Sequence, residues 1–149
     1  MTTDDEARLT GRDPASDSLP IAEFGYSGPL RDQLVAAILD GSKTTTTGLW
    51  LDYEADGSPL PKPGELHSVI DSAGKPVAVI EILAASIVRI ADVDLQHCID
   101  EGEGDTTVAG WREGHTRFFE SAEMREVLGA PDFKVEDDTL VVVQRFRLV

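Results

Sequence analysis

The segment from Gly28 to Thr47 constrains the fold more than any other part of this sequence. Gly28-Pro29 opens it, Gly41 interrupts it, and the apolar residues between them recur at helical spacing: Leu30, Leu34, Val35, Ile38 and Leu39. Proline at the first helical position and glycine just after the last one are the usual boundaries of a helix. The pattern predicts a helix that begins at Pro29 and ends before Gly41.

One lysine and four threonines follow this helix. We expect Lys43 to Thr47 to form an extended segment, in which alternate side chains share a face. Lys43, Thr45 and Thr47 would then point one way, and Thr44 and Thr46 the other, unless a twist or bulge at the start of the strand brings Lys43 and Thr46 together. A purely structural interpretation is available, because β-branched threonine favours strands and a helix C-terminus favours a cation. The chemical interpretation is that the run places one amine among hydroxyl groups.

The 149 residues are enough for one domain with a sizeable core. Residues 1–18 are rich in Asp, Thr and Ser and lack periodicity, so we expect a disordered acidic tail followed by a folded domain over 19–149. No stretch approaches the about 20 apolar residues of a membrane span, and the N-terminus is acidic where a signal peptide would be basic. A single cysteine, Cys98, excludes an internal disulfide framework. We therefore expect a cytoplasmic protein that does not associate with membranes.

The formal net charge of −15 bears on possible partners. Proteins that bind duplexes or long single strands usually carry a basic surface that displaces counterions, so the charge weakens the case for a polynucleotide partner and makes DNA unexpected. The acidic excess is uneven, since much of it lies in the tail while several arginines lie in the second half: Arg112, Arg117, Arg145 and Arg147. A local basic site therefore stays open, and a small neutral substrate is fully compatible with the charge.

The remaining pattern is that of an α+β fold. Asp52 to Gly64 contains Asp-Gly and three prolines, which predicts a long loop. Alternating apolar residues predict mostly antiparallel strands at Leu66–Ile70, Pro76–Leu83, Ser86–Ile90 and Thr139–Val149. A short helix is expected from Asp94 to Glu101, and a second helix, capped by Thr106, carries an aromatic stripe. A small curled sheet or β-barrel of these strands, flanked by the helices, would satisfy the pattern.

The acidic and histidine residues do not form a recognisable metal motif. Glu101-Gly102-Glu103-Gly104-Asp105 alternates carboxylates with glycines, but a calcium loop needs Gly at its sixth position and Glu at its twelfth, where this chain has Thr106 and Arg112. The three histidines, His67, His97 and His115, are too scattered to indicate a zinc site. We expect neither a metal nor another cofactor.

Two residues of the aromatic helix are candidates for binding. His115 follows Trp111 by one helical turn, a place where a histidine is usually a core or capping residue and less often a catalyst. Arg112 lies at the edge of the apolar stripe. We expect its guanidinium to be partly buried and paired with an acid between Glu101 and Asp105, or to bind a ligand oxygen.

Five motifs taken together resemble the ASCH domain family over roughly Ile21 to Val149. They are Phe24-Gly25, Gly41-Ser42-Lys43-Thr44, the hairpin from Val69 to Pro76, Glu101-Gly102-Glu103-Gly104-Asp105, and Trp111-Arg112-x-x-His115-x-x-Phe118-Phe119. The family resembles the PUA superfold, a small β-barrel with helices around one cleft. That fold is associated with RNA and modified nucleobases, so the resemblance implies a modified nucleoside or RNA as partner.

A shorter branch of this family contains amidohydrolases that deacetylate N4-acetylcytidine with a Lys, a Thr three residues later and a distant Glu. The matching positions here are Lys43, Thr46 and, from the His-x-x-x-Glu spacing, Glu101. In that branch a basic residue follows the Thr by two, where this chain has Gly48. The Trp-Arg-x-x-His helix is typical of a longer branch, some members of which resemble ribonucleases.

The resemblance implies roles for these residues. Thr46 would attack the acyl carbonyl, Lys43 would be its base if desolvation kept the amine neutral, and Glu101 would act from the far side of the substrate, because direct pairing would favour the ammonium. Trp50 or Tyr53 would stack on a pyrimidine, with substrate contacts from Glu103, Arg112 and His115. Three functions stay open: a nucleoside amidohydrolase, a ribonuclease and a noncatalytic RNA-binding module.

Overall fold

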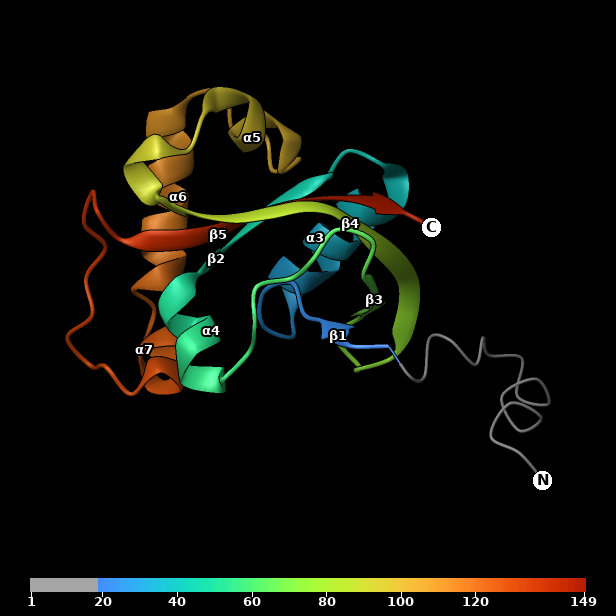
Figure 1. Cartoon of the computed structure of the whole chain (residues 1–149), viewed down its shortest axis with the longest axis horizontal. Helices are drawn as coiled ribbons and strands as arrows, with labels where there is room; N and C mark the ends of the chain where they lie inside the picture. Colours follow the sequence, from blue (N-terminus) through green and yellow to red (C-terminus); the bar gives the residue numbers. More distant parts are fainter. Residues whose placement is uncertain (1–18) are drawn as a thin grey trace.

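The computed structural model describes residues 19–149 (Figure 1). The expected acidic tail, residues 1–18, lies outside this range. In chain order the elements are β1 (Ile21–Ala22), α3 (Pro29–Asp40), β2 (Thr45–Leu49), α4 (Trp50–Asp56), β3 (Leu66–Ile70), β4 (Pro76–Arg89), a 3-10 turn (Ile90–Asp92), α5 (Leu95–Asp100), α6 (Val108–Phe119), α7 (Ala122–Leu128) and β5 (Leu140–Leu148). None of the described helices is both long and apolar enough to cross a bilayer.

The described strands form one mixed sheet in the order β1-β3-β4-β5-β2. The β1–β3 pair is parallel and the other pairs are antiparallel, which confirms an α+β fold with mostly antiparallel strands. The expected β-barrel is not confirmed, because β1 and β2 lie at opposite edges of the sheet and do not pair with each other. With only two residues, β1 offers too few backbone groups to close the sheet.

Three local predictions differ from the structure in instructive ways. The two strands expected at Pro76–Leu83 and Ser86–Ile90 are one long strand, β4, whose register against β5 shifts between Ile82 and Ala84. A bulge of this kind bends a strand without ending it. Part of the loop expected from Asp52 is helical, since α4 extends to Asp56 and ends at Gly57. The cap of α6 is Thr107, one residue after the predicted Thr106.

Apolar side chains cover both faces of the sheet. One core includes Leu34, Val35 and Ile38 of α3, packed with Phe24 and Phe146. The other includes Trp111 and Phe119 of α6, Cys98 of α5 and Met124 of α7, packed with Leu49 and Val141. Figure 1 shows α6 standing at one end of the sheet, with α5 near its upper end and α7 near its lower end. Because β5 is covered on both faces, the adjacent Val141 and Val142 are both fully buried.

The segment between α3 and β2 is held on both sides by backbone hydrogen bonds. Gly41 ends α3 in the left-handed conformation, at φ 87°, as its position after the helix predicts. The Lys43 amide then bonds to the Ala37 carbonyl at 3.0 Å, and the Thr44 amide bonds to the Asp100 carbonyl at 2.8 Å. The start of β2 is thereby fixed against the C-terminal end of α5, fifty-odd residues further along the chain.

Candidate functional site

Lys43 is a buried lysine at the edge of the sheet. Its Nζ donates to the Thr45 carbonyl at 2.8 Å and to the Glu101 carbonyl at 3.4 Å, and it lies 3.5 Å from Glu101 Oε1. Its side chain is 1% exposed, and the amine lies 5.8 Å from the centre of the Phe24 ring. A buried ammonium is costly unless it is paired and hydrogen-bonded. The two hydrogen bonds and the ion pair with Glu101 meet that requirement.

The Glu101 carboxylate is the centre of the buried network. Oε2 accepts hydrogen bonds from Thr47 Oγ1 at 2.7 Å and Trp111 Nε1 at 2.8 Å, while Oε1 accepts one from His115 Nε2 at 3.1 Å. Burial acts to raise the pKa of Glu101, but the hydrogen bonds from His115 and His97 and the charge of Lys43 hold it well below its usual value. Glu101 is therefore an ionised carboxylate whose lone pairs are already in use.

Thr47 connects a histidine to this carboxylate. Its hydroxyl lies 2.7 Å from His97 Nε2 as well as 2.7 Å from Glu101 Oε2. Because a hydroxyl has one proton, donation to Glu101 requires His97 Nε2 to donate to the Thr47 oxygen. Thr45, on the same face of β2, donates to the His97 carbonyl at 2.9 Å. The threonines at 45 and 47 thus attach the sheet edge to α5.

His115 approaches Glu101 from α6. Its ring stacks on Trp111 with centroids 4.2 Å apart, its Nδ1 lies 3.0 Å from the Trp111 carbonyl, and its Nε2 faces Glu101 Oε1. Both neighbours only accept hydrogen bonds, an arrangement that favours protons on both ring nitrogens. Burial acts to lower the pKa of His115, but the hydrogen bond to Glu101 and the charges of Glu101 and Glu103 raise it above its usual value.

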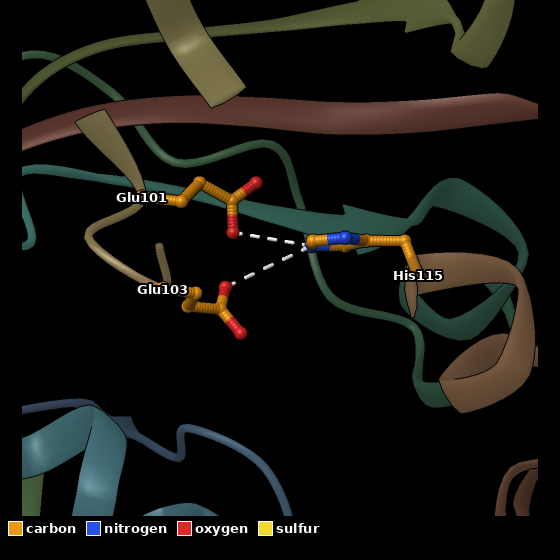
Figure 2. A group of neighbouring side chains, drawn as sticks. All are labelled: Glu101, Glu103 and His115. Carbon is orange, nitrogen blue, oxygen red and sulfur yellow. Dashed lines mark hydrogen bonds and ion pairs between the residues drawn. The ribbon is translucent and has the colours of Figure 1, made fainter. Parts of the chain in front are cut away.

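Glu103 is the second carboxylate of the group. Figure 2 shows Glu101 and Glu103 facing His115 from the loop after α5. Glu103 Oε2 lies 4.0 Å from both His115 Nε2 and Lys43 Nζ, and its side chain is 29% exposed. Burial and the adjacent Glu101 carboxylate raise the pKa of Glu103 to about 7, against the opposing charges of Lys43 and His115. Two neighbouring carboxyl groups with separated pKa values are typical of acid–base sites.

The glycine between the two glutamates is required by its surroundings. Gly102 has φ +71°, and a Cβ built there would lie 2.6 Å from the Ser42 carbonyl oxygen. The backbone on either side of Lys43 therefore approaches the glutamate loop more closely than a side chain would allow. This close approach explains why Lys43 reaches both the backbone and the carboxylate of Glu101.

The same glutamates and His115 have the spacing of a metal site. Within the described residues, Glu101, Glu103 and His115 can offer ligand atoms that all lie within 4.8 Å of one another. The Lys43 amine, however, already supplies positive charge to both carboxylates, at 3.5 Å from one and 4.0 Å from the other. A divalent cation in this position would be repelled by the Lys43 ammonium and would compete with it for both carboxylates. The geometry fits an ion-paired cluster better than a metal centre.

The structure brings together four of the residues selected from the sequence: Lys43, Glu101, Glu103 and His115. It does not place Glu101 across a substrate from Lys43, because the two side chains are in direct contact. Thr46 lies on the other face of β2 from Thr45 and Thr47, opposite Gln144 of β5. Across the described residues, no hydrogen bond joins its hydroxyl to Lys43 or Glu101.

The other predicted binding residues lie apart from the cluster. Trp50 stacks on Tyr53 within α4 at 5.9 Å, and the Tyr53 hydroxyl accepts a hydrogen bond from Gln144 at 2.8 Å. Arg112 is partly buried, as expected, but its partner is Asp137 at 3.1 Å and not an acid between Glu101 and Asp105. The segment before β5 approaches α6 in the fold and supplies this carboxylate.

Sequence reasoning did not select Thr47, His97 or Trp111 as members of the site. Two signals were present. Strict alternation already grouped Thr47 with Lys43 on one face of the strand, and the i,i+4 spacing of His97 and Glu101 places them on one side of a helix. The Trp111 indole, in contrast, looked like a core residue, and only the fold shows that its N–H bonds to Glu101.

We expect Gly102→Ala to lower the free energy of unfolding by about 3 kcal/mol and Gly104→Ala by only about 1 kcal/mol. Both glycines have positive φ, at +71° and +90°, but a Cβ at Gly104 meets nothing within 4 Å. The difference between the two variants in urea unfolding therefore measures the clash with Ser42. Equal losses would show that the close approach is unimportant.

The two carboxyl groups also predict how stability depends on pH. Since the pKa of Glu103 is raised from 4.5 to about 7 on folding, the folded protein retains a proton that the unfolded chain loses, and stability must fall as pH rises between these values. The raised pKa of His115 acts in the same direction, because its contribution is present at low pH and fades above its folded pKa.

We expect unfolding in urea to show wild type losing about 2 kcal/mol more than Glu103→Gln between pH 5 and pH 8, after discounting for partial exposure. Glu113→Gln, on the exposed side of α6, should follow wild type. Parallel curves for wild type and Glu103→Gln would contradict the raised pKa.

Comparisons with known proteins agree with this fold. The family model described as ASCH domain matches residues 21–149. The crystal structure of protein EF3133 from Enterococcus faecalis V583 is similar, with a TM-score of 0.74 and 26% identity over 97% of this chain and 83% of that one. An ASCH domain structure from Lactobacillus crispatus JV V101 has a TM-score of 0.70 and 26% identity, covering 96% of this chain and 89% of that one. No curated protein sequence matches the chain significantly. With nearly all of the described residues inside the family match, the chain belongs to the ASCH domain family.

Proposed function

We propose that this protein is an amidohydrolase that removes an acyl group from a modified nucleoside such as N4-acetylcytidine. The observation that carries the proposal is the buried pair of Lys43 and Glu101, 3.5 Å apart, with the partly exposed Glu103 beside it. A purely structural ion pair does not require a second carboxyl group with a raised pKa at its open side. The set offers a fixed positive charge and a proton carrier, which amide hydrolysis needs.

The charge distribution favours a nucleoside over a polynucleotide. Most of the described arginines are paired with carboxylates, which leaves few cations for a phosphate backbone. These pairs are Arg31–Glu23, Arg89–Asp92, Arg112–Asp137, Arg117–Glu113, Arg145–Asp100 and Arg147–Glu81. Glu103 would also repel a phosphate once it is ionised. A neutral acylated nucleoside carries no phosphate, so it neither needs these cations nor is repelled by Glu103.

The ion pair changes the role expected for Lys43. An amine that donates to two carbonyls and forms an ion pair with an ionised carboxylate is held as an ammonium, so it is poorly suited to remove a proton. In this proposal the ammonium stabilises the negative oxygen that forms on the acyl carbon during attack. Glu101 is a positioning residue, because it holds Lys43 and His115 in place.

Thr46 is the proposed nucleophile. Three threonines lie on β2, and two of their hydroxyls are already committed, since Thr45 bonds to the His97 carbonyl and Thr47 to Glu101. No hydrogen bond involves the Thr46 hydroxyl in the part of the chain that the structure describes, and the side chain is half-buried. Its position three residues after Lys43 is also that of the Thr in the amidohydrolase branch.

We expect pure protein to release cytidine and acetate from N4-acetylcytidine, and Thr46→Ala to lower kcat by at least about 100-fold. Thr47→Ala is the matched control, with an expected loss of about tenfold through weaker positioning of Glu101. Thr46→Ser should retain activity because it keeps the hydroxyl. Release of cytidine is followed by chromatography, with unfolding curves recorded for each variant.

The assay includes other acylated nucleosides and a single-stranded RNA. Failure to cleave every acylated nucleoside, together with cleavage of the RNA, would replace the proposal with a ribonuclease. Tight, steeply salt-dependent RNA binding without cleavage would indicate a noncatalytic RNA-binding module. A larger loss of kcat in Thr47→Ala than in Thr46→Ala would indicate that Thr47, and not Thr46, is the nucleophile.

A further inference from the structure

Amide hydrolysis at this site needs a group that can both take and return a proton. Lys43 is poorly suited to do so, because its amine donates to two carbonyls and is paired with the Glu101 carboxylate, which favours the ammonium. Glu101 cannot do so either, because its oxygens accept bonds from Thr47, Trp111 and His115 and its pKa lies well below its usual value. The most strongly hydrogen-bonded members of the cluster are therefore its least suitable proton carriers.

Glu103 differs from them in exposure and in bonding. Its side chain is 29% exposed, whereas those of Lys43 and Glu101 are 1% exposed, so it forms the open side of the cluster. Its nearest cations, the Lys43 amine and His115 Nε2, are each 4.0 Å from Oε2, beyond hydrogen-bond distance. A substrate that approaches the buried ion pair from solvent meets this carboxyl group first.

We propose that Glu103 is the catalytic acid–base of the deacylation and that Glu101 only positions its neighbours; this inference rests on the proposed amidohydrolase function. Glu103 thereby has a different role from Glu101, which is the glutamate that matches the amidohydrolase branch. The glycines on either side, at φ +71° and +90°, let the loop present both carboxyl groups to the same cations.

The proton and the bonds balance as follows. The Thr46 oxygen bonds to the acyl carbon while its proton passes through one bridging water to the Glu103 carboxylate, because Thr46 lies on the other face of β2 from the threonines that contact the cluster. The carbon–nitrogen bond then breaks, and Glu103 returns the proton to the leaving exocyclic nitrogen, which releases the nucleoside and leaves an acyl ester on Thr46. Water adds to the ester carbon with its proton going to Glu103, and that proton returns through the bridging water to the Thr46 oxygen as the carboxylic acid leaves. The sum is amide plus water giving amine plus acid.

The surroundings of Glu103 suit this role. The charged groups that face it are Lys43 before β2, Glu101 after α5 and His115 on α6. Burial, a hydrogen bond shared with Glu101 and the Glu101 charge favour the protonated form, while the charges of Lys43 and His115 favour the ionised form. The resulting pKa of about 7 allows both forms of Glu103 at neutral pH.

The test compares Glu103→Gln, Glu103→Asp and Glu113→Gln with wild type on N4-acetylcytidine, measuring kcat and KM from pH 5 to pH 9. We expect kcat of wild type to rise with pH through about 7, following Glu103. Glu103→Gln should lower kcat at least about 100-fold and change KM little. The rise of kcat with pH should be absent from this variant. Glu103→Asp should recover part of the activity, and Glu113→Gln should match wild type. EDTA should change nothing.

The outcomes separate this inference from the function on which it rests. If wild type deacylates no nucleoside, the proposed function is wrong and Glu103 has no such role. If wild type is active and Glu103→Gln keeps its kcat and its pH profile, the function stands and the inference is wrong. If EDTA abolishes the activity of wild type and a divalent cation restores it, Glu103 would be assigned to a metal site. That result would also overturn the inference that Glu103 is the catalytic acid–base. A lower melting temperature of Glu103→Gln with unchanged kcat would indicate a structural role only.

Discussion

The buried ion pair between Lys43 and Glu101 is the interaction on which the rest of the site depends. Breaking a buried pair of this kind costs about 3–5 kcal/mol, because the remaining charge is left without a partner. Lys43 comes from the edge of the sheet and Glu101 from the end of α5, so the pair joins two elements that are distant in sequence. The hydrogen bonds from Thr47, Trp111 and His115 then fix the carboxylate from three sides.

Because the hydrogen bonds to Glu101 occupy its oxygens, the two glutamates have different roles. Glu101 is ionised and fully bonded, which makes it a strong organiser and a weak base. Glu103, two residues later, has the same chemistry but faces solvent and remains close to proton exchange at neutral pH. Environment, and not residue type, therefore decides which of the two carboxyl groups can act on a substrate. Gly102 makes the arrangement possible, since any side chain there would collide with the Ser42 backbone.

Local signals explain which features could be predicted from sequence. The helix from Pro29 to Asp40 and the strand Leu66–Ile70 follow from residues within or next to them, and both are confirmed. The β-barrel is not confirmed, and the sequence pattern could not decide it, because sheet closure depends on pairing between strands that are far apart in the chain. Family motifs selected Lys43 and Glu101, but not their direct contact, and the partner of Arg112 lies in a segment that carries no pattern of its own. Contacts made by tertiary packing were the part that periodicity could not supply.

The titration of the two carboxyl groups tests this account most directly. Carbon-13 NMR of the side-chain carboxyls, assigned with Glu101→Gln and Glu103→Gln, would follow both groups from pH 3 to pH 9 in the folded protein. The account predicts that Glu103 titrates with a midpoint of about 7, while Glu101 stays ionised throughout the range in which the fold persists. A Glu103 that is fully ionised at pH 5, or a Glu101 that titrates near neutrality in its place, would contradict it.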